Sequence, residues 1–273
     1  LQFDSSRSGP NKDKDPSIAA AGKYHPASSD ANGNNGGGVF SVYHATAGTL
    51  SVMAGRISFL LGVTGPCVAM DTACSSSLVA LHAAKRSLQL GECDVAIVAG
   101  VNVLDAETSI ACAVAGMTSP DGKCHTFDES ANGYGRGEGC GVIILKRTSD
   151  AVAAADNIYA VVKGSAVQQD GKSASLTAPN GKAQERLIRD ALKDASLSAG
   201  DVRYLEAHGT GTKLGDPIET GALAHVFGAD RDASDPLVVG GVKGNLGHLE
   251  AAAGIAGVIS AMLVLRHGVA PPN

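Results

Sequence analysis

One cysteine, Cys74, stands where a strand-like segment (65–69) passes into an apolar segment of helical character, within the run MDTACSSSLVAL (70–81). The unpaired N–H groups and the positive dipole end at a helix N-terminus favour a thiolate over a thiol. Such positions can lower a cysteine pKa to about 3.5–7.5. The pattern predicts a nucleophile for thioester exchange. An isolated cysteine before a helix is more often a small core residue, so the role of Cys74 has to be judged from the other motifs in the chain.

Two histidines follow predicted strands and enter glycine-rich turns. The segment EAHGTGTKLGDPIE (206–219) places His208 at a strand end, and GVKGNLGHLEAAAG (241–254) places His248 before an Ala-rich helix. Ligands bind at strand ends in α/β sheets. A lone histidine near a turn is more often a hydrogen-bonded structural residue, but two in equivalent settings favour a shared role.

Cys74, His208 and His248 lie far apart in the sequence and do not have the spacing of a metal motif, so we expect no metal. They can form a Cys/His/His constellation that folding assembles. The remaining histidines have no comparable setting, and we assign them no role.

Two glycine-containing segments do not support a phosphate-binding function. GYGRGEGCG (133–141) puts Cys140 at the third glycine position of a dinucleotide motif and leads into a strand. DGKS (170–173) lacks the upstream glycine of a P-loop, because Ala166 occupies that position. A turn is the better interpretation of the second segment.

Strands and helices alternate along the chain, which predicts parallel strand pairing and an α/β layer architecture. The run 94–103 is almost entirely apolar, so we expect a strand buried on both faces. Gly91 is expected to end the helix before it. The predicted helices are 78–90, 182–195 and 250–265, and the predicted strands are 94–103, 141–146, 158–164, 202–207 and 237–242.

The composition limits the class of protein. The 273 residues are 44% hydrophobic and 18% charged with 35 glycines, which is typical of a compact α/β protein. The net charge of −5 comes from well-mixed charges, so we expect no nucleic-acid partner. The six cysteines form no CxxC pair, which predicts free thiols and a reducing compartment, cytoplasm or plastid.

The ends of the chain and its longest apolar run bear on targeting. The run 251–265 is shorter than the about 20 residues that a membrane span needs. We therefore expect a buried helix and no membrane span. The chain opens with Leu1, so we expect the native N-terminus, with any targeting peptide, to be missing.

Taken together, the motifs resemble a known family. DTACSSSLVALH (71–82), the 206–219 segment and GVKGNLGH (241–248) closely resemble the three active-site signatures of β-ketoacyl synthases, and 119–147 and 176–184 resemble further family blocks. The resemblance runs in order from about residue 54 to residue 272. It implies a thiolase-like α/β fold of two similar βαβ-type halves in stacked layers (αβαβα), normally homodimeric and here truncated at both ends.

The resemblance also implies a reaction. Cys74 would accept an acyl group from the phosphopantetheine thioester of an acyl carrier protein. A malonyl carrier protein would then lose CO₂, and His208 and His248 would stabilise the enolate oxygen while the carbanion attacks the Cys74 thioester. A dry pocket needs preoriented donors for such an enolate.

Further residues are implied by their positions in the family motifs. Thr210 and Thr212 match positions that contact the pantetheine arm, and Lys243 matches a lysine that supports the site. No bound cofactor is implied, because the substrate is carried on the phosphopantetheine of the acyl carrier protein. The implied partners are that carrier protein and a second copy of the chain.

Within the family we expect the polyketide type. Discrete fatty-acid synthases generally place a glutamate nine residues after the second histidine, where Gly257 stands here. The alternatives are a fatty-acid ketosynthase, a non-catalytic synthase-like partner and a cysteine hydrolase. Retention of all three catalytic residues argues against the non-catalytic partner, and a hydrolase explains neither the second histidine nor the GTGT turn.

The expected domain organisation has three parts. Residues 1–38 are predicted to be a flexible polar extension, 39–150 the half with the nucleophile, and 151–273 an incomplete half with both histidines. In relatives, a Gly-rich Phe loop that follows the position of Asn273 supplies one N–H of the oxyanion hole. The nucleophile's own N–H supplies the other.

Overall fold

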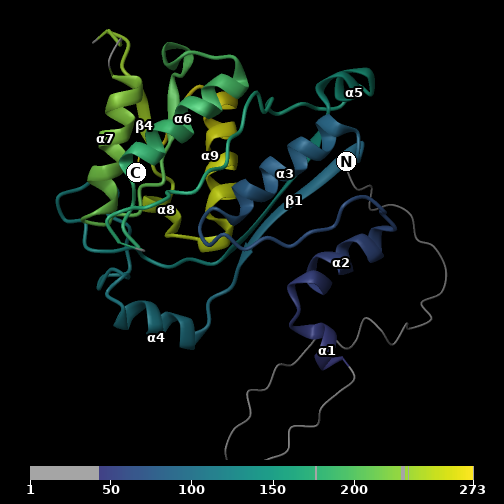
Figure 1. Cartoon of the computed structure of the whole chain (residues 1–273), viewed down its shortest axis with the longest axis horizontal. Helices are drawn as coiled ribbons and strands as arrows, with labels where there is room; N and C mark the ends of the chain where they lie inside the picture. The colour runs from purple at the N-terminus through teal and green to yellow at the C-terminus, as the bar shows by residue number, and fades with distance from the viewer. Residues whose placement is uncertain (1–42, 176, 229–230, 233, 273) are drawn as a thin grey trace, which may run out of the picture. The chain divides into compact units, whose positions relative to one another are not determined.

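The computed structural model describes residues 43–175, 177–228, 231–232 and 234–272 (Figure 1). The extension predicted for 1–38 lies outside these residues. The chain forms two units, 1–49 and 50–273, and the described part of the first holds the short helix α1 (His44–Ala47), followed by Gly48.

The second unit contains the elements that position the site. In chain order they are α2 (Leu50–Leu61), α3 (Ser76–Leu90), β1 (Val95–Asn102), α4 (Ala106–Val114), β2 (Gly139–Lys146), α5 (Thr148–Ala153), α6 (Gly181–Ala195), the 3-10 turn η1 (Ala199–Asp201), β3 (Tyr204–Glu206), α7 (Gly215–Phe227), β4 (Val238–Gly240), α8 (Lys243–Leu246), the 3-10 turn η2 (Glu250–Ala252) and α9 (Ala253–His267). The predicted helices correspond to α3, α6 and η2 with α9. Gly91 ends α3 in the left-handed conformation, at φ +74°, as expected for a C-terminal glycine.

The first sheet pairs β1 with β2 in the antiparallel direction, from Val95 opposite Lys146 to Asn102 opposite Gly139. The prediction of parallel pairing is therefore wrong for these two strands, because the connection that carries α4 returns the chain in the opposite direction. Burial on both faces is also wrong for β1. Its residues alternate, with Val98 buried and Ile97 exposed, because helices cover one face only within the described part of the chain.

The second sheet confirms parallel pairing for the other two strands. β3 and β4 are parallel, with Tyr204 opposite Val238 and Glu206 opposite Gly240, and α7 lies in the connection between them. The segments 158–164 and 65–69, which were predicted as strands, are not assigned to any strand. Their β-branched and apolar residues indicate strands, but a strand also needs a hydrogen-bonded neighbour.

The core lies where α3 and α9 cover the same face of the first sheet (Figure 1). Its buried residues are Leu81 on α3, Val98 on β1, Ala252 at the end of η2 and Ile255 on α9. The stretch Glu250–His267 is, among the described residues, long and apolar enough to cross a membrane by length and composition alone. Only its first turns are buried in this core, so the prediction of a buried helix is confirmed for that end alone.

A close approach at Gly100 joins the segments that carry the candidate catalytic residues. A Cβ on Gly100 would lie 2.8 Å from Cβ of Ser77 and 3.1 Å from Cα of Ala252. The backbone N–H of Ile255 also donates to Oγ of Ser77, at 3.0 Å. The start of α3 and the start of α9 are thus held against the same point of β1, which we call the Gly100 seam.

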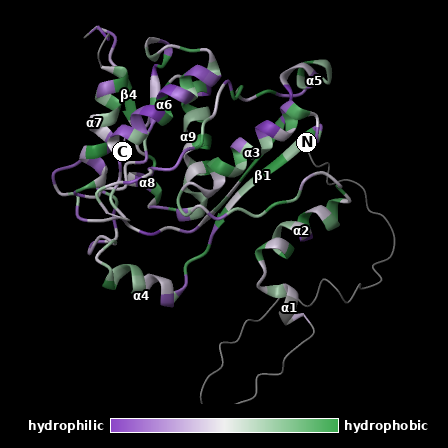
Figure 2. Cartoon of the chain, viewed as in Figure 1, coloured by the Kyte–Doolittle hydropathy of each residue, from purple (hydrophilic) through white to green (hydrophobic). Residues whose placement is uncertain are grey.

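Apolar residues also make up much of two other helices, α2 and α4 (Figure 2). Phe59 on α2 is 90% exposed and Val114 on α4 is 84% exposed. Neither helix has a buried residue among those described, so their apolar surface is not part of the core.

Candidate active site

Cys74 lies in a tight turn immediately before α3. Ala73 has φ +55°, a conformation that non-glycine residues rarely adopt. The turn is held locally: the N–H of Ala73 donates to Oδ1 of Asp71 at 3.0 Å, and the N–H of Thr72 donates to Oγ of Ser76 at 2.9 Å. Cys74 is half-buried and precedes the first residues of α3, as the sequence predicts.

His208 is positioned by Glu219, a residue of α7. The backbone N–H groups of His208 and Gly209 donate to the two carboxylate oxygens of Glu219, at 2.7 and 2.8 Å. β3 ends at Glu206, so His208 follows the strand end as predicted. The carboxylate fixes the backbone where the strand passes into the glycine-rich turn.

Asp216, also on α7, holds the rest of the same turn. Its buried carboxylate accepts from the N–H groups of Phe127 at 2.8 Å, Gly211 at 3.1 Å and Thr212 at 3.2 Å. One side chain thus ties the turn after β3 to the loop around residue 127.

We expect Asp216→Asn to lower the free energy of unfolding by about 1–3 kcal/mol, because asparagine lacks the negative charge to which the three backbone N–H groups donate. Urea denaturation measures this change. The matched control is Asp232→Asn, since Asp232 accepts from the N–H of Ser234 at 2.8 Å in an exposed loop. Equal effects of the two substitutions would contradict an anchoring role for Asp216.

The two predicted pantetheine-contacting threonines lie in this turn. Thr210 is buried, and its Oγ1 lies 3.4 Å from Oγ1 of Thr212. Oγ1 of Thr212 accepts from the N–H of Gly215 at 3.1 Å, at the start of α7. The hydroxyls are therefore neighbours, and that of Thr212 also binds the N–H of the first residue of α7.

His248 is held by main-chain contacts on both sides. Its N–H donates to the carbonyl of Gly135 at 2.6 Å, and its carbonyl accepts from the N–H of Gly137 at 2.9 Å. The ring atom Nδ1 accepts from the N–H of Glu250 at 3.0 Å. Because Nδ1 is an acceptor in this bond, the proton of the neutral ring lies on Nε2, which is then a donor.

Folding brings the three candidate catalytic side chains together. Sγ of Cys74 and one ring nitrogen of each of His208 and His248 lie within 4.8 Å of one another. The two rings are perpendicular, with centroids 5.7 Å apart. The constellation predicted from three distant motifs is therefore present as a cluster.

The donor set of this cluster does not fit a metal ion. Cysteine and two histidines suit zinc by residue type. However, Nδ1 of His248 already accepts the Glu250 N–H, so Nε2 carries a proton and has no free lone pair for a metal. Coordination through His248 would require breaking that hydrogen bond, and the geometry favours a hydrogen-bond donor instead.

Burial sets the protonation state of the cluster. It raises the pKa of the Cys74 thiol above its ordinary value, and the nearby Lys243 ammonium only partly opposes this. The expectation of a thiolate in the resting site is therefore corrected: desolvation outweighs the favourable charges. Burial likewise lowers the pKa of Lys243, although Glu219 and Cys74 oppose the shift.

Both histidines are neutral at neutral pH. Burial and the charge of Lys243 lower the pKa of His248 to about 4. His208 is exposed to solvent, but desolvation by the groups packed around it, followed by the charges of Lys243 and His248, lowers its pKa as well. The resting cluster therefore combines a thiol with two neutral imidazoles.

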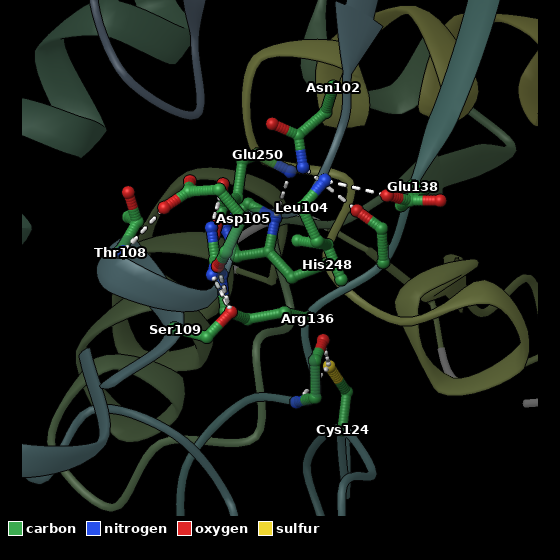
Figure 3. Close-up of polar contacts among 12 residues, drawn as sticks. Asn102, Leu104, Asp105, Thr108, Ser109, Cys124, Arg136, Glu138, His248 and Glu250 are labelled. Carbon is green, nitrogen blue, oxygen red and sulfur yellow. Dashed lines mark hydrogen bonds and ion pairs between the residues drawn. The ribbon is translucent and has the colours of Figure 1, made fainter. Parts of the chain in front are cut away.

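The sequence motifs contain several positioning residues to which we assigned no role. Asp216 and Glu219 stand in the same motif as His208. Two carboxylates that follow this histidine within one motif were the signal from which their role could have been predicted. Arg136 and Glu250 bind each other close to His248 (Figure 3). Tyr134 packs edge-on against the His248 ring, with centroids 5.1 Å apart.

Comparison with known proteins identifies the class. The chain matches the family described as beta-ketoacyl synthase, N-terminal domain, over residues 17–151, and beta-ketoacyl synthase, C-terminal domain, over residues 159–273. The ketosynthase from module 6 of the bacillaene synthase from Bacillus subtilis 168 superimposes with a TM-score of 0.79 and 43% identity, over 82% of this chain and 40% of that one. The fold is thus the thiolase-like α/β fold of ketosynthases, as predicted.

Curated relatives point the same way. Highly reducing polyketide synthase 40 of Fusarium mangiferae is 50% identical over 232 residues, which are 85% of this chain and 9% of that protein. The 6-methylsalicylic acid synthase of Aspergillus niger is 53% identical over 221 residues, 80% of this chain and 12% of the relative. The chain spans about a tenth of the length of these relatives. It belongs to the β-ketoacyl synthase family.

Proposed function

We propose that the chain catalyses decarboxylative condensation of carrier-protein thioesters in polyketide synthesis. The observation that carries the proposal is the cluster of one thiol and two neutral imidazoles within 4.8 Å. A thiol can hold an acyl group as a thioester, and two preoriented imidazoles can bind a developing oxyanion.

In the first step, Sγ of Cys74 attacks the thioester carbonyl of an acyl group on phosphopantetheine. The thiol proton has to leave, and the phosphopantetheine sulfur has to gain one as its bond to the carbonyl carbon breaks. The ring of His208 can relay this proton, because none of the hydrogen bonds assigned among the described residues occupies its nitrogens. His248 is less suited to the relay, since its Nδ1 is already an acceptor.

In the second step, a malonyl-type thioester loses CO₂, and the electron pair of the broken bond forms an enolate. The enolate oxygen accepts a hydrogen bond from Nε2–H of His248 and one from His208. The enolate carbon then attacks the Cys74 thioester, and the C–S bond breaks with its electron pair on Sγ. Cys74 then takes up one proton from solvent, because its original proton left on the phosphopantetheine thiol in the first step. The β-ketoacyl product leaves on the carrier protein that delivered the malonyl group.

The remaining assignments rest on the same cluster. We propose that Thr210 and Thr212 contact the pantetheine arm, and that Lys243 supports the site as a buried positive charge next to Cys74. Burial of Lys243 and Thr210 beside the cluster supports these roles. The proposed partners are an acyl carrier protein and a second copy of the chain, and the proposed boundary between the two halves lies near residue 150.

Gly257 supports the polyketide type for a physical reason. A Cβ at Gly257 would lie 3.2 Å from Cγ of Glu206. The Glu206 carboxylate accepts from the N–H of Val242 at 2.7 Å and from Oγ of Ser260 at 3.0 Å. A glutamate at position 257 would bring a second carboxylate close to this one, and the Glu206 side chain would have to shift to make room for its Cβ.

Intact-mass measurement tests the proposal. Acyl carrier protein thioesters are added to the full chain, and malonyl carrier protein is added afterwards. We expect an acyl adduct on the peptide that contains Cys74, followed by β-ketoacyl carrier protein. Free acid without condensation product would indicate a hydrolase, and the absence of any adduct would indicate a non-catalytic partner.

A further inference from the structure

We propose that Arg136 and Glu250 are a positioning pair that sets the orientation and tautomer of His248. The inference rests on the proposed function, because it assigns His248 the donor that the enolate needs. Neither residue belongs to the Cys/His/His cluster itself.

The pair is joined by two hydrogen bonds in a fork. Nε of Arg136 donates to Oε1 of Glu250 at 2.5 Å, and Nη2 donates to Oε2 at 2.9 Å. The third guanidinium nitrogen, Nη1, donates to Oγ of Ser109 on α4 at 2.6 Å (Figure 3). The Arg136 side chain is 7% exposed, so the fork is a shielded, bidentate ion pair rather than a surface contact.

The backbone of Glu250 needs such an anchor. Its φ is +45°, a conformation that costs a non-glycine residue free energy. In this conformation its N–H donates to Nδ1 of His248 at 3.0 Å. The side chain of Glu250 therefore holds a strained peptide whose N–H fixes the proton of His248 on Nε2.

The segment around Arg136 holds His248 from the main-chain side as well. Gly135 accepts from the N–H of His248, and Gly137 donates to its carbonyl, so the residues flanking Arg136 bind the backbone of His248. Arg136 itself binds Glu250, two residues beyond His248. One short segment thus fixes both the backbone and the ring of His248.

The test compares substitutions that remove the fork with one that removes the strain as well. We expect Arg136→Met and Glu250→Ala to lower the condensation rate by roughly 10- to 100-fold, as a displaced catalytic group does. Acylation of Cys74 should persist, because it does not depend on the Nε2–H of His248. Glu250→Gly should retain more condensation than Glu250→Ala, since glycine adopts a positive φ readily.

Two further measurements keep the result specific. Arg189→Met is the matched control, because Arg189 is a half-exposed arginine paired with Glu185 on α6 and should leave both steps unchanged. NMR of the full chain with ¹⁵N-labelled histidines, assigned with His248→Gln, reads the tautomer directly. We expect Nε2–H in the native chain and a mixture in Arg136→Met.

The NMR readout does not depend on the proposed reaction, so it separates the two proposals. An unchanged His248 tautomer together with unchanged condensation in folded Arg136→Met would overturn the positioning role. If Arg136→Met fails to fold, Arg136→Lys replaces it, since lysine keeps the charge and loses the fork. Equal loss of acylation and condensation in Arg136→Lys would likewise count against the inference.

Discussion

Replacing Cys74 by alanine removes the acyl adduct and lowers the condensation rate by a factor on the order of 10⁴ or more, as loss of a nucleophile does in other covalent enzymes. The reason is that Sγ of Cys74 is, within the described cluster, the group that can hold the acyl chain as a thioester. Intact mass reports the adduct, and chromatography of the carrier-protein products reports condensation.

The control for this substitution is Cys67→Ala. Cys67 is an exposed thiol in the segment before the nucleophile turn. Its removal should leave adduct and product unchanged, which separates loss of the nucleophile from general thiol loss. An adduct of native size on the Cys74→Ala chain would place the nucleophile elsewhere and end the proposed mechanism.

Replacing His248 by alanine is expected to lower condensation by about 10²–10³-fold, the effect of losing one oxyanion donor. Transfer of an acyl group to Cys74 should remain, because His208 is still available to relay the proton. Single-turnover experiments that measure the adduct and the β-ketoacyl product separately distinguish the two steps.

His248→Gln tests whether donation is the property that matters. The glutamine amide carries N–H donors, so this variant should recover part of the condensation rate that His248→Ala loses. His225→Ala serves as the control, since His225 is an exposed residue of α7 outside the cluster. If acylation and condensation fall by the same factor in His248→Ala, the division of labour between the two histidines is wrong.

Individual helices and strand ends could be predicted because the residues that indicate them are close together in the sequence. The apolar spacing and Gly91 define α3, and the strand–turn pattern around His208 defines the end of β3. The three candidate catalytic residues followed from motifs whose residue types fit acyl transfer. We expected folding to assemble them into one constellation, and in the structure their ligand atoms lie within 4.8 Å of one another.

Three properties depend on long-range contacts and could not be read from a local pattern. The antiparallel pairing of β1 with β2 depends on the path of the connection between them. The raised pKa of Cys74 depends on burial in the folded chain, which outweighs the opposing charge of Lys243, a residue distant in the sequence. The fork between Arg136 and Glu250 joins positions 114 residues apart.

The Gly100 seam has a consequence for chimaeric synthases. A chimaera that takes the first half of this chain and the second half of a relative keeps every catalytic motif whole. The segments from the two source proteins nevertheless pack against each other in the core. There the N–H of Ile255 donates to Oγ of Ser77, next to Gly100, which has no room for a side chain. Whether such hybrids work is therefore decided less by the chosen breakpoint than by how well the parents match at this buried joint.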